Sequence, residues 1–201
     1  MVNRKMLVGA LVIAAGAAVL FAADAGATMF DPEAPKRVGT WDWGVLGGGA
    51  FNEAHDDTLY VQTQIAYGLT PWLAVGGETG YQESMGQFND ESVGIVQIMG
   101  DILLRVPTVH DAIVPYAVVG LGGLGAWVED TDGVAPDNNG GDVSDVAFGW
   151  KLGGGVDIFF DKHWVGCFEG AYFDGANELP GSSVEDNIQF FTFAAGIKYV
   201  D

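Results

Sequence analysis

The chain has 201 residues, of which 49% are hydrophobic, and it carries 27 Asp and Glu residues against 8 Lys and Arg, a formal net charge of −19 at pH 7. This length is enough for one domain, and the acidic balance disfavours binding to nucleic acid, because the phosphate backbone would be repelled. The only cysteine is Cys167, which excludes an intramolecular disulfide.

The first 27 residues are predicted to be a secretory signal peptide. A start with two basic residues is followed by an uncharged apolar run over residues 7–23 and by a small-residue cleavage site, Ala-Gly-Ala, at residues 25–27. A membrane-anchor helix is the alternative, and the short run and the cleavage site count against it. We therefore expect residues 28–36 to be a short periplasmic lead and residues 37–201 to form the folded domain.

Eight segments share a strand pattern, in which apolar residues alternate with small, polar or charged ones. Because successive side chains of a strand point to opposite faces, each segment has an apolar face and a leaner face. The fifth segment is apolar on both faces, so its faces stay unassigned. In chain order the predicted strands are residues 37–51, 58–69, 72–83, 92–106, 114–128, 143–160, 164–175 and 187–200.

The sixth and seventh strands form the clearest hairpin. Asp161-Lys162-His163 is a three-residue turn, which places Lys151 opposite Phe173 and Glu169 opposite Gly155. Lys151, Asp157 and Glu169 then share the lean face. The other face is aromatic and aliphatic, which suits a barrel whose apolar face lies against lipid and whose narrow lumen holds a few paired charges.

The connections alternate between short turns, at residues 68–71, 107–111 and 161–163, and longer loops, at residues 52–57, 84–91, 129–142 and 174–186. Short turns on one rim and longer loops on the other are the layout of an outer-membrane barrel. The sequence therefore predicts an all-β fold: an eight-stranded antiparallel up-and-down transmembrane β-barrel with both termini on the periplasmic side. A soluble lipocalin-like barrel is the alternative, and it would turn its apolar face inward around a ligand.

The alternation also assigns side chains to the two faces. Val75, Ile98, Trp150, Ile158, Phe160 and Phe191 are predicted to face lipid. The lumen is predicted to receive Asp42, Glu78, Asp101, Arg105, Lys151, Asp157, Glu169 and Lys198. Charges in such a space are costly unless paired, so we expect a network that plugs the lumen, with Asp157 and Glu169 on either side of Lys151. A gated pore for ions or small solutes is the alternative, although eight strands leave little room beyond their own side chains.

The longer loops are rich in carboxylates, which a solvated, self-repelling surface would explain. The alternative is a weak Ca²⁺ or Mg²⁺ site, because hard cations bind carboxylate and carbonyl oxygens. The candidate ligands are Asp130, Asp132, Asp137 and Asp142 in the longest loop. No other cofactor is expected.

Enzymatic activity is not expected. A lipid-modifying enzyme of the outer membrane would need a serine and a histidine at the membrane rim, but His55, His110 and His163 lie on different connections. The spacing shows no arrangement of nucleophile, base and orienting group. A lipid-modifying enzyme is therefore kept only as a remote alternative to a structural or surface-interaction barrel.

Several loose features resemble the small outer-membrane β-barrel domain family, the OmpA-, OmpX- and OmpW-like porin-family proteins. They are Pro115-Tyr116 before a Gly-rich strand, the segment FGWKLGGGVD at residues 148–157, the aromatic strand around Glu169–Tyr172, and a last strand ending Gly196–Tyr199. The resemblance implies residence in the outer membrane of a Gram-negative-type bacterium, contact with outer-membrane lipids and the barrel-assembly machinery, and a monomer. Such barrels usually finish on an aromatic residue, whereas here Val200 and Asp201 follow Tyr199.

Overall fold

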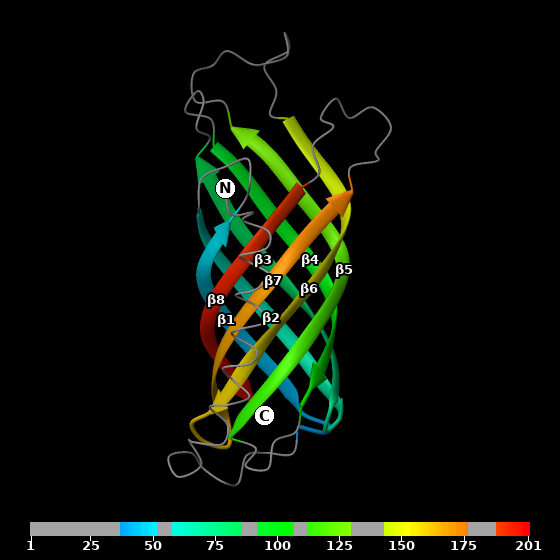
Figure 1. Cartoon of the computed structure of the whole chain (residues 1–201), viewed down its shortest axis with the longest axis vertical. Coiled ribbons are helices and arrows are strands. Elements are labelled where there is room, and N and C mark those ends of the chain that lie inside the picture. The colour runs from blue at the N-terminus through cyan, green and yellow to red at the C-terminus, as the bar shows by residue number, and fades with distance from the viewer. Residues whose placement is uncertain (1–36, 52–57, 86–91, 107–111, 130–142, 177–187) are drawn as a thin grey trace, which may run out of the picture.

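The structure, a computed structural model, describes residues 37–51, 58–85, 92–106, 112–129, 143–176 and 188–201. Eight antiparallel strands follow one another around a closed barrel, each paired with its neighbours in the chain and the last paired with the first (Figure 1). The strands are β1 Trp41–Phe51, β2 Thr58–Thr70, β3 Leu73–Met85, β4 Ser92–Arg105, β5 Ile113–Glu129, β6 Val143–Phe159, β7 Trp164–Ala176 and β8 Ile188–Val200. The eight-stranded antiparallel fold predicted from the sequence is therefore confirmed.

The predicted strand bounds agree with the observed ones to within a few residues, except at the start of β1. This strand begins at Trp41 rather than at residue 37, because the chain bends at Gly39, whose φ of +79° is a left-handed conformation that glycine adopts readily. In the β6–β7 hairpin, Lys151 pairs with Phe173 as predicted. The signal peptide predicted for residues 1–27 and the lead at residues 28–36 lie outside the described residues.

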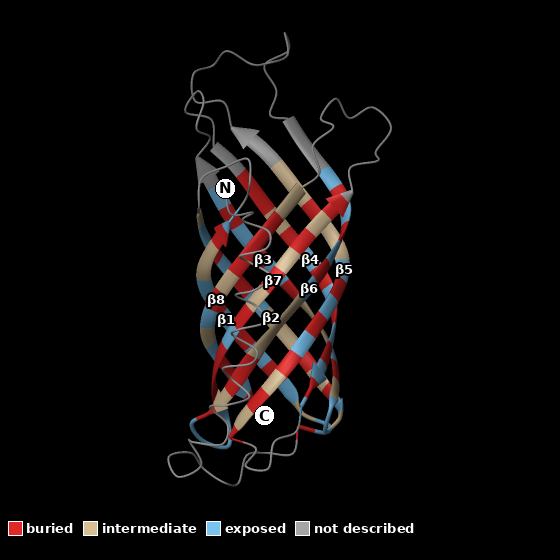
Figure 2. Ribbon diagram, viewed as in Figure 1, coloured by how far each residue is buried: buried red, intermediate tan, exposed pale blue. Residues whose placement is uncertain are grey.

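Burial alternates along the strands, which Figure 2 shows as bands of buried and exposed residues. The inward-facing set includes all the lumen charges predicted from the sequence. It also settles the faces of β5, where Val114, Tyr116, Val118 and Leu124 are buried inside the barrel. Large inward side chains need small neighbours: a Cβ atom at Gly155 would lie 2.6 Å from the Tyr116 ring, so this glycine makes room for the tyrosine.

The outer face carries aromatic side chains near both rims and mostly aliphatic side chains between them. Residues of the rim with the short turns include Trp41, Trp43, Tyr67, Trp72, Phe160, Trp164 and Tyr199. Residues toward the other rim include Phe51, Tyr81, Phe148, Tyr172 and Phe191. Such a pair of aromatic girdles around an apolar band is typical of a barrel that spans a membrane.

Two outward residues are less exposed than their position predicts. Phe191 is on the outer parity of β8 but only 8% exposed, because its ring packs edge-on against Phe193 with centroids 4.6 Å apart. Val156 is likewise 8% exposed, between its strand partners Pro115 and Phe168. Both residues therefore lie on the predicted outer face, where neighbouring side chains cover them.

The last residues of the chain close the barrel at the rim that holds the short turns, where Figure 1 places the C-terminus. The Trp41 N–H donates to Asp201 Oδ1 at 2.8 Å, and the Asp201 N–H donates to the Trp41 carbonyl at 3.1 Å. On the other side of β8, the Val200 N–H donates to the His163 carbonyl at 2.8 Å. Asp201 therefore continues the β8–β1 pairing. No helix among the described residues is long and apolar enough to span a membrane.

Candidate functional site: the charged lumen

A central cluster lies near the middle of the barrel interior, around Lys151. The Lys151 side chain is 0% exposed, and its Nζ donates to Glu78 Oε2 and, at 2.9 Å, to Glu169 Oε1. Asp101 Oδ2 lies 3.7 Å from the same nitrogen. Three carboxylates from β3, β4 and β7 thus surround one ammonium group from β6, which ties together strands from around the ring.

Neutral hydrogen-bonding side chains complete this cluster. Gln62 Nε2 donates to Glu78 Oε2 at 2.5 Å, and Gln97 Nε2 donates to Glu78 Oε1 at 3.3 Å. Tyr60 accepts from Gln97 and donates to Gln62 Oε1 at 2.9 Å. These bonds occupy both oxygens of the Glu78 carboxylate, as a buried ion requires if its desolvation is to be offset.

A second cluster, the rim cluster, lies at the strand ends nearest the short turns. Asp157 is held by Arg37 at 2.6 Å and by Lys198 at 2.9 Å, while Asp42 is held by Arg105 at 2.5 Å. Arg37 Nε lies 3.7 Å from Asp42 Oδ2 and so links the two pairs. Three cations face two carboxylates here, the reverse of the central cluster.

Tyr116 joins the two clusters. Its hydroxyl donates to Glu169 Oε2 at 2.8 Å, and it accepts from Lys198 Nζ at 3.5 Å. The Lys198 ammonium also lies 4.6 Å from the centroid of the Tyr116 ring, within the range of a cation–π contact. The acid-rich centre and the base-rich rim are therefore one connected network.

Apolar side chains fill the lumen on both sides of this network. Toward the long-loop rim, Leu46, Met99, Leu124, Phe173 and Phe190 belong to one buried cluster, in which the two phenylalanine rings stack at 4.6 Å. At the short-turn ends, Val114, Phe159, Val165 and Val200 form another. The interior is thus layered, with charges between two apolar layers.

Some buried polar atoms of the lumen make no hydrogen bond within the part of the chain that the structure describes. They include Arg37 Nε and Nη2, Arg105 Nε and Nη1, Asp42 Oδ1, Asp101 Oδ1, Gln64 Nε2 and Gln82 Oε1. Buried polar groups ordinarily have a partner. The four guanidinium nitrogens all belong to the rim cluster. Most of these donors without an acceptor among the described residues therefore lie at the short-turn end of the lumen.

All the charged residues assigned to the lumen from the sequence are buried inside the barrel. The expectation that Asp157 lies beside Lys151 is wrong: Asp157 binds Arg37 and Lys198 instead. Six residues of strand separate Asp157 from Lys151, about 20 Å, which is too far for a contact along one strand. The expected contact with Glu169 is present.

Sequence reasoning missed several members of the network, namely Arg37, Tyr60, Gln62, Gln97 and Tyr116. Tyr60, Gln62 and Gln97 alternate with aliphatic residues along their predicted strands, and this alternation is the signal that could have found them. Tyr116 could not be found because both faces of β5 are apolar in the sequence.

The other sequence-derived candidates fall mostly outside the described side chains. The loop carboxylates Asp130, Asp132, Asp137 and Asp142 lie outside the described residues, as do His55 and His110. Of the three histidines, only His163 is described; its Nδ1 lies 2.8 Å from the Val200 carbonyl and its ring stacks on Tyr199. Among the residues that the structure does describe, no cluster of His, Cys, Asp or Glu side chains is arranged to hold a metal ion.

The exposed β6–β7 turn carries a perturbed acid. The Asp161 carboxylate accepts the backbone N–H groups of Trp164 and His163, each at 2.7 Å. These two bonds stabilise the ionised form and hold the pKa of Asp161 below its ordinary value.

Comparison with known proteins places this geometry in a family. Residues 8–200 match the family described as "Outer membrane protein beta-barrel domain". Among curated proteins, no match to the chain is found.

Solved structures with a similar fold include three small bacterial barrels. The N-terminal β-barrel domain of Pseudomonas aeruginosa OprF is 13% identical, with a TM-score of 0.53, and the alignment covers 82% of this chain and 98% of that one. Ail, the attachment invasion locus protein of Yersinia pestis, is 13% identical with a TM-score of 0.51 over 82% and 99%. Neisserial surface protein A is 13% identical with a TM-score of 0.58 over 80% and 95%. At these identities the likeness concerns the fold alone.

The closed eight-stranded ring, the aromatic girdles and the family match over nearly the whole chain agree with one another. The chain therefore belongs to the outer membrane protein beta-barrel domain family and is an integral protein of the outer membrane of a Gram-negative-type bacterium.

Proposed function

We propose that this protein is a structural or surface-interaction barrel whose lumen is plugged and does not conduct. The observation that carries the proposal is the layered interior, in which a fully buried Lys151 and its carboxylate partners lie between apolar layers. An eight-stranded barrel is only just wide enough for its own side chains. With the interior filled, the loops and the outer wall remain as the surfaces through which the protein acts.

Electrical recording tests the plug. The purified barrel in planar bilayers should give no conductance steps above the lipid background. As a matched control, the variant L124A/F173A removes two fully buried side chains from the apolar layer and should admit ions. Regular conductance steps from the unaltered protein would contradict a plugged lumen.

A narrow channel for ions or small solutes is the second candidate, and one observation favours it. The unpartnered polar atoms are spread from the rim cluster, at Arg37 and Arg105, to the level of Gln64 and Gln82. Water would satisfy these atoms and would also lower the barrier to an ion. The recordings above separate the candidates, because a hydrated but closed lumen gives no steps.

The surface role predicts which connections face outward. An epitope inserted in the loop at residues 130–142 should be accessible to antibody on intact cells. The same epitope in the turn at residues 161–163 should be accessible only after the outer membrane is permeabilised. The reverse pattern would show the opposite orientation and would remove the acidic loops from the cell surface.

We further propose that the protein acts as a monomer without enzymatic activity. Every strand has both neighbours within one closed ring, so no open sheet edge calls for a second copy. Sedimentation in detergent checks the monomer. Incubation with radiolabelled phospholipids tests the absence of enzymatic activity. Release of fatty acid or transfer of an acyl chain would contradict this part of the proposal.

A further inference from the structure

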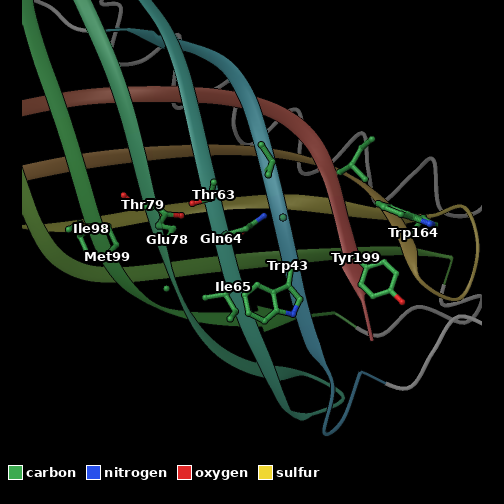
Figure 3. A pocket seen from close by; sticks show the side chains of 14 residues that line it. Trp43, Thr63, Gln64, Ile65, Glu78, Thr79, Ile98, Met99, Trp164 and Tyr199 are labelled. Atoms are coloured by element: carbon green, nitrogen blue, oxygen red, sulfur yellow. The ribbon is translucent and has the colours of Figure 1, made fainter.

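The outer wall of the barrel has a hollow of about 780 Å³ that extends from the ends of β7 and β8 across β1, β2 and β3 to β4 (Figure 3). Aromatic residues border one end of it, namely Trp43, Trp164 and Tyr199, and Ile98 borders the other. The volume is in the range of ordinary ligand pockets, about 300–1,000 Å³. Because it opens on the face that lies against lipid, its occupant comes from the membrane.

The pairing of the strands explains why the wall is hollow here. One row of directly paired outward residues runs Tyr199, Trp43, Ile65, Gly77, and the next runs Ile197, Val45, Thr63, Thr79, Ile98. Each row begins with large side chains. The first row then ends at Gly77, which has no side chain, and the second passes through the small side chains of Thr63 and Thr79. The floor of the hollow is therefore set by three small residues on two neighbouring strands.

The hollow runs diagonally from the rim to the middle of the membrane. Trp164 and Tyr199 lie at strand ends beside a short turn, whereas Ile98 is in the middle of β4. The path from Trp43 on β1 to Ile98 on β4 crosses three strand pairs, about 14 Å at about 4.8 Å each, and advances two residues along the strands, about 7 Å. With strands tilted by about 40°, the two parts together rise about 14 Å, close to half of a hydrocarbon core of about 30 Å.

We propose that this hollow binds one acyl chain of a phospholipid from the membrane leaflet on the side of the short turns. The chain would start at the belt of Trp43, Trp164 and Tyr199, where indole N–H and phenol groups meet the headgroup region. It would end against Ile98 near the midplane, after passing over Thr63 and Thr79. The length of the path matches one leaflet.

A second copy of the barrel fits this surface less well. Two convex barrel walls meet along a narrow line, so a neighbouring barrel would leave the hollow largely unfilled. A single flexible hydrocarbon chain can follow a curved diagonal groove and fill it. Packing to the density of a protein interior therefore favours the acyl chain.

The test uses the full-length folded barrel in vesicles of phosphatidylethanolamine and phosphatidylglycerol, with a trace of phospholipid that carries a photoactivatable diazirine in its acyl chain. After illumination, mass spectrometry should find adducts on β2 and β3 around Thr63 and Thr79 at several times the yield found on Val119 and Leu152, which are exposed on other strands. The variant T63L/T79L, which fills the floor, should lose this excess. T79L alone serves if the double variant does not fold.

The control variant is A117L/G123L, which adds more bulk than T63L/T79L but on the outer face of β5, where a Cβ atom at Gly123 meets nothing within 4 Å. It should leave the adducts at Thr63 and Thr79 unchanged. Adducts spread evenly over all strands in the unaltered protein would overturn the proposal. Dimers in sedimentation that T63L/T79L abolishes would also overturn it, by showing that a second copy occupies the wall.

Discussion

Replacing Lys151 with methionine tests whether the central cluster stabilises the barrel. The lysine is fully buried and faces Glu78, Glu169 and Asp101, so its removal leaves three carboxylates near one another without a cation. Methionine has a similar length and volume, which keeps the cavity contribution small. The measured change therefore reports mainly on the lost charge.

The expected loss is about 3–5 kcal/mol of unfolding free energy, the range for removing one partner of a buried ion pair. An independent estimate agrees: unit charges 4 Å apart at an effective dielectric constant of about 20 interact by about 4 kcal/mol. Removing a carboxylate together with the lysine, as in E78Q/K151M, should recover part of the loss. The coupling expected for such contacting residues is about 0.5–3 kcal/mol.

Urea unfolding of the barrel in lipid vesicles, followed by tryptophan fluorescence and by gel mobility without heating, measures these changes. The matched control is K162M, the same replacement at an exposed lysine of the β6–β7 turn, where we expect less than about 1 kcal/mol. An unchanged unfolding midpoint in K151M, at an unchanged slope, would show that the network contributes no stability and would refute this reasoning.

Four further outcomes are expected. Ile98→Lys places a charge on the lipid face near mid-membrane and should destabilise the barrel by about 2–4 kcal/mol, whereas strong labelling of a cysteine at this position by a membrane-impermeant reagent would contradict the facing. Tyr116→Phe removes the hydrogen bond to Glu169 and should cost about 1.5–3 kcal/mol, measured by the same urea unfolding. Because the pKa of Asp161 is lowered on folding, its contribution to turn stability is present above its ordinary pKa and is lost as the pH falls through the lowered value; NMR titration of the turn amides measures this. Millimolar Ca²⁺ should shift amide signals of the loop at residues 130–142 beyond the shifts that NaCl gives at matched ionic strength; identical shifts would exclude a site.

Period-two alternation was sufficient to predict the strands and most of their faces. The register of the β6–β7 hairpin could also be predicted, because a three-residue turn fixes which residues pair, as Lys151 and Phe173 do. The faces of β5 could not be assigned from its apolar residues, and this is why Tyr116 was missed. Only closure of the ring shows that this tyrosine points inward.

Contacts across the lumen were beyond the reach of the sequence. Glu78 and Lys151 form an ion pair although their strands, β3 and β6, are not neighbours in the ring. The residue pattern along either strand does not indicate which residue will be the partner. Arg37 lies before β1, ahead of the bend at Gly39, so no strand alternation places its side chain in the lumen beside Asp157. Membership of the lumen follows from local periodicity, whereas pairing inside it depends on strand tilt and ring closure.

The bonds between Trp41 and Asp201 have a consequence for biosynthesis. Residues 160 positions apart make the seam, so a nascent chain leaves the ribosome with its first strand long before that strand has its final partner. An unpaired strand edge is a template for aggregation, and the growing chain must be kept from pairing wrongly until its last residues arrive. Proline has no backbone N–H, so Trp41→Pro would remove the hydrogen bond that Trp41 donates to Asp201. We therefore expect this substitution to impair closure of the ring when the barrel inserts into the membrane.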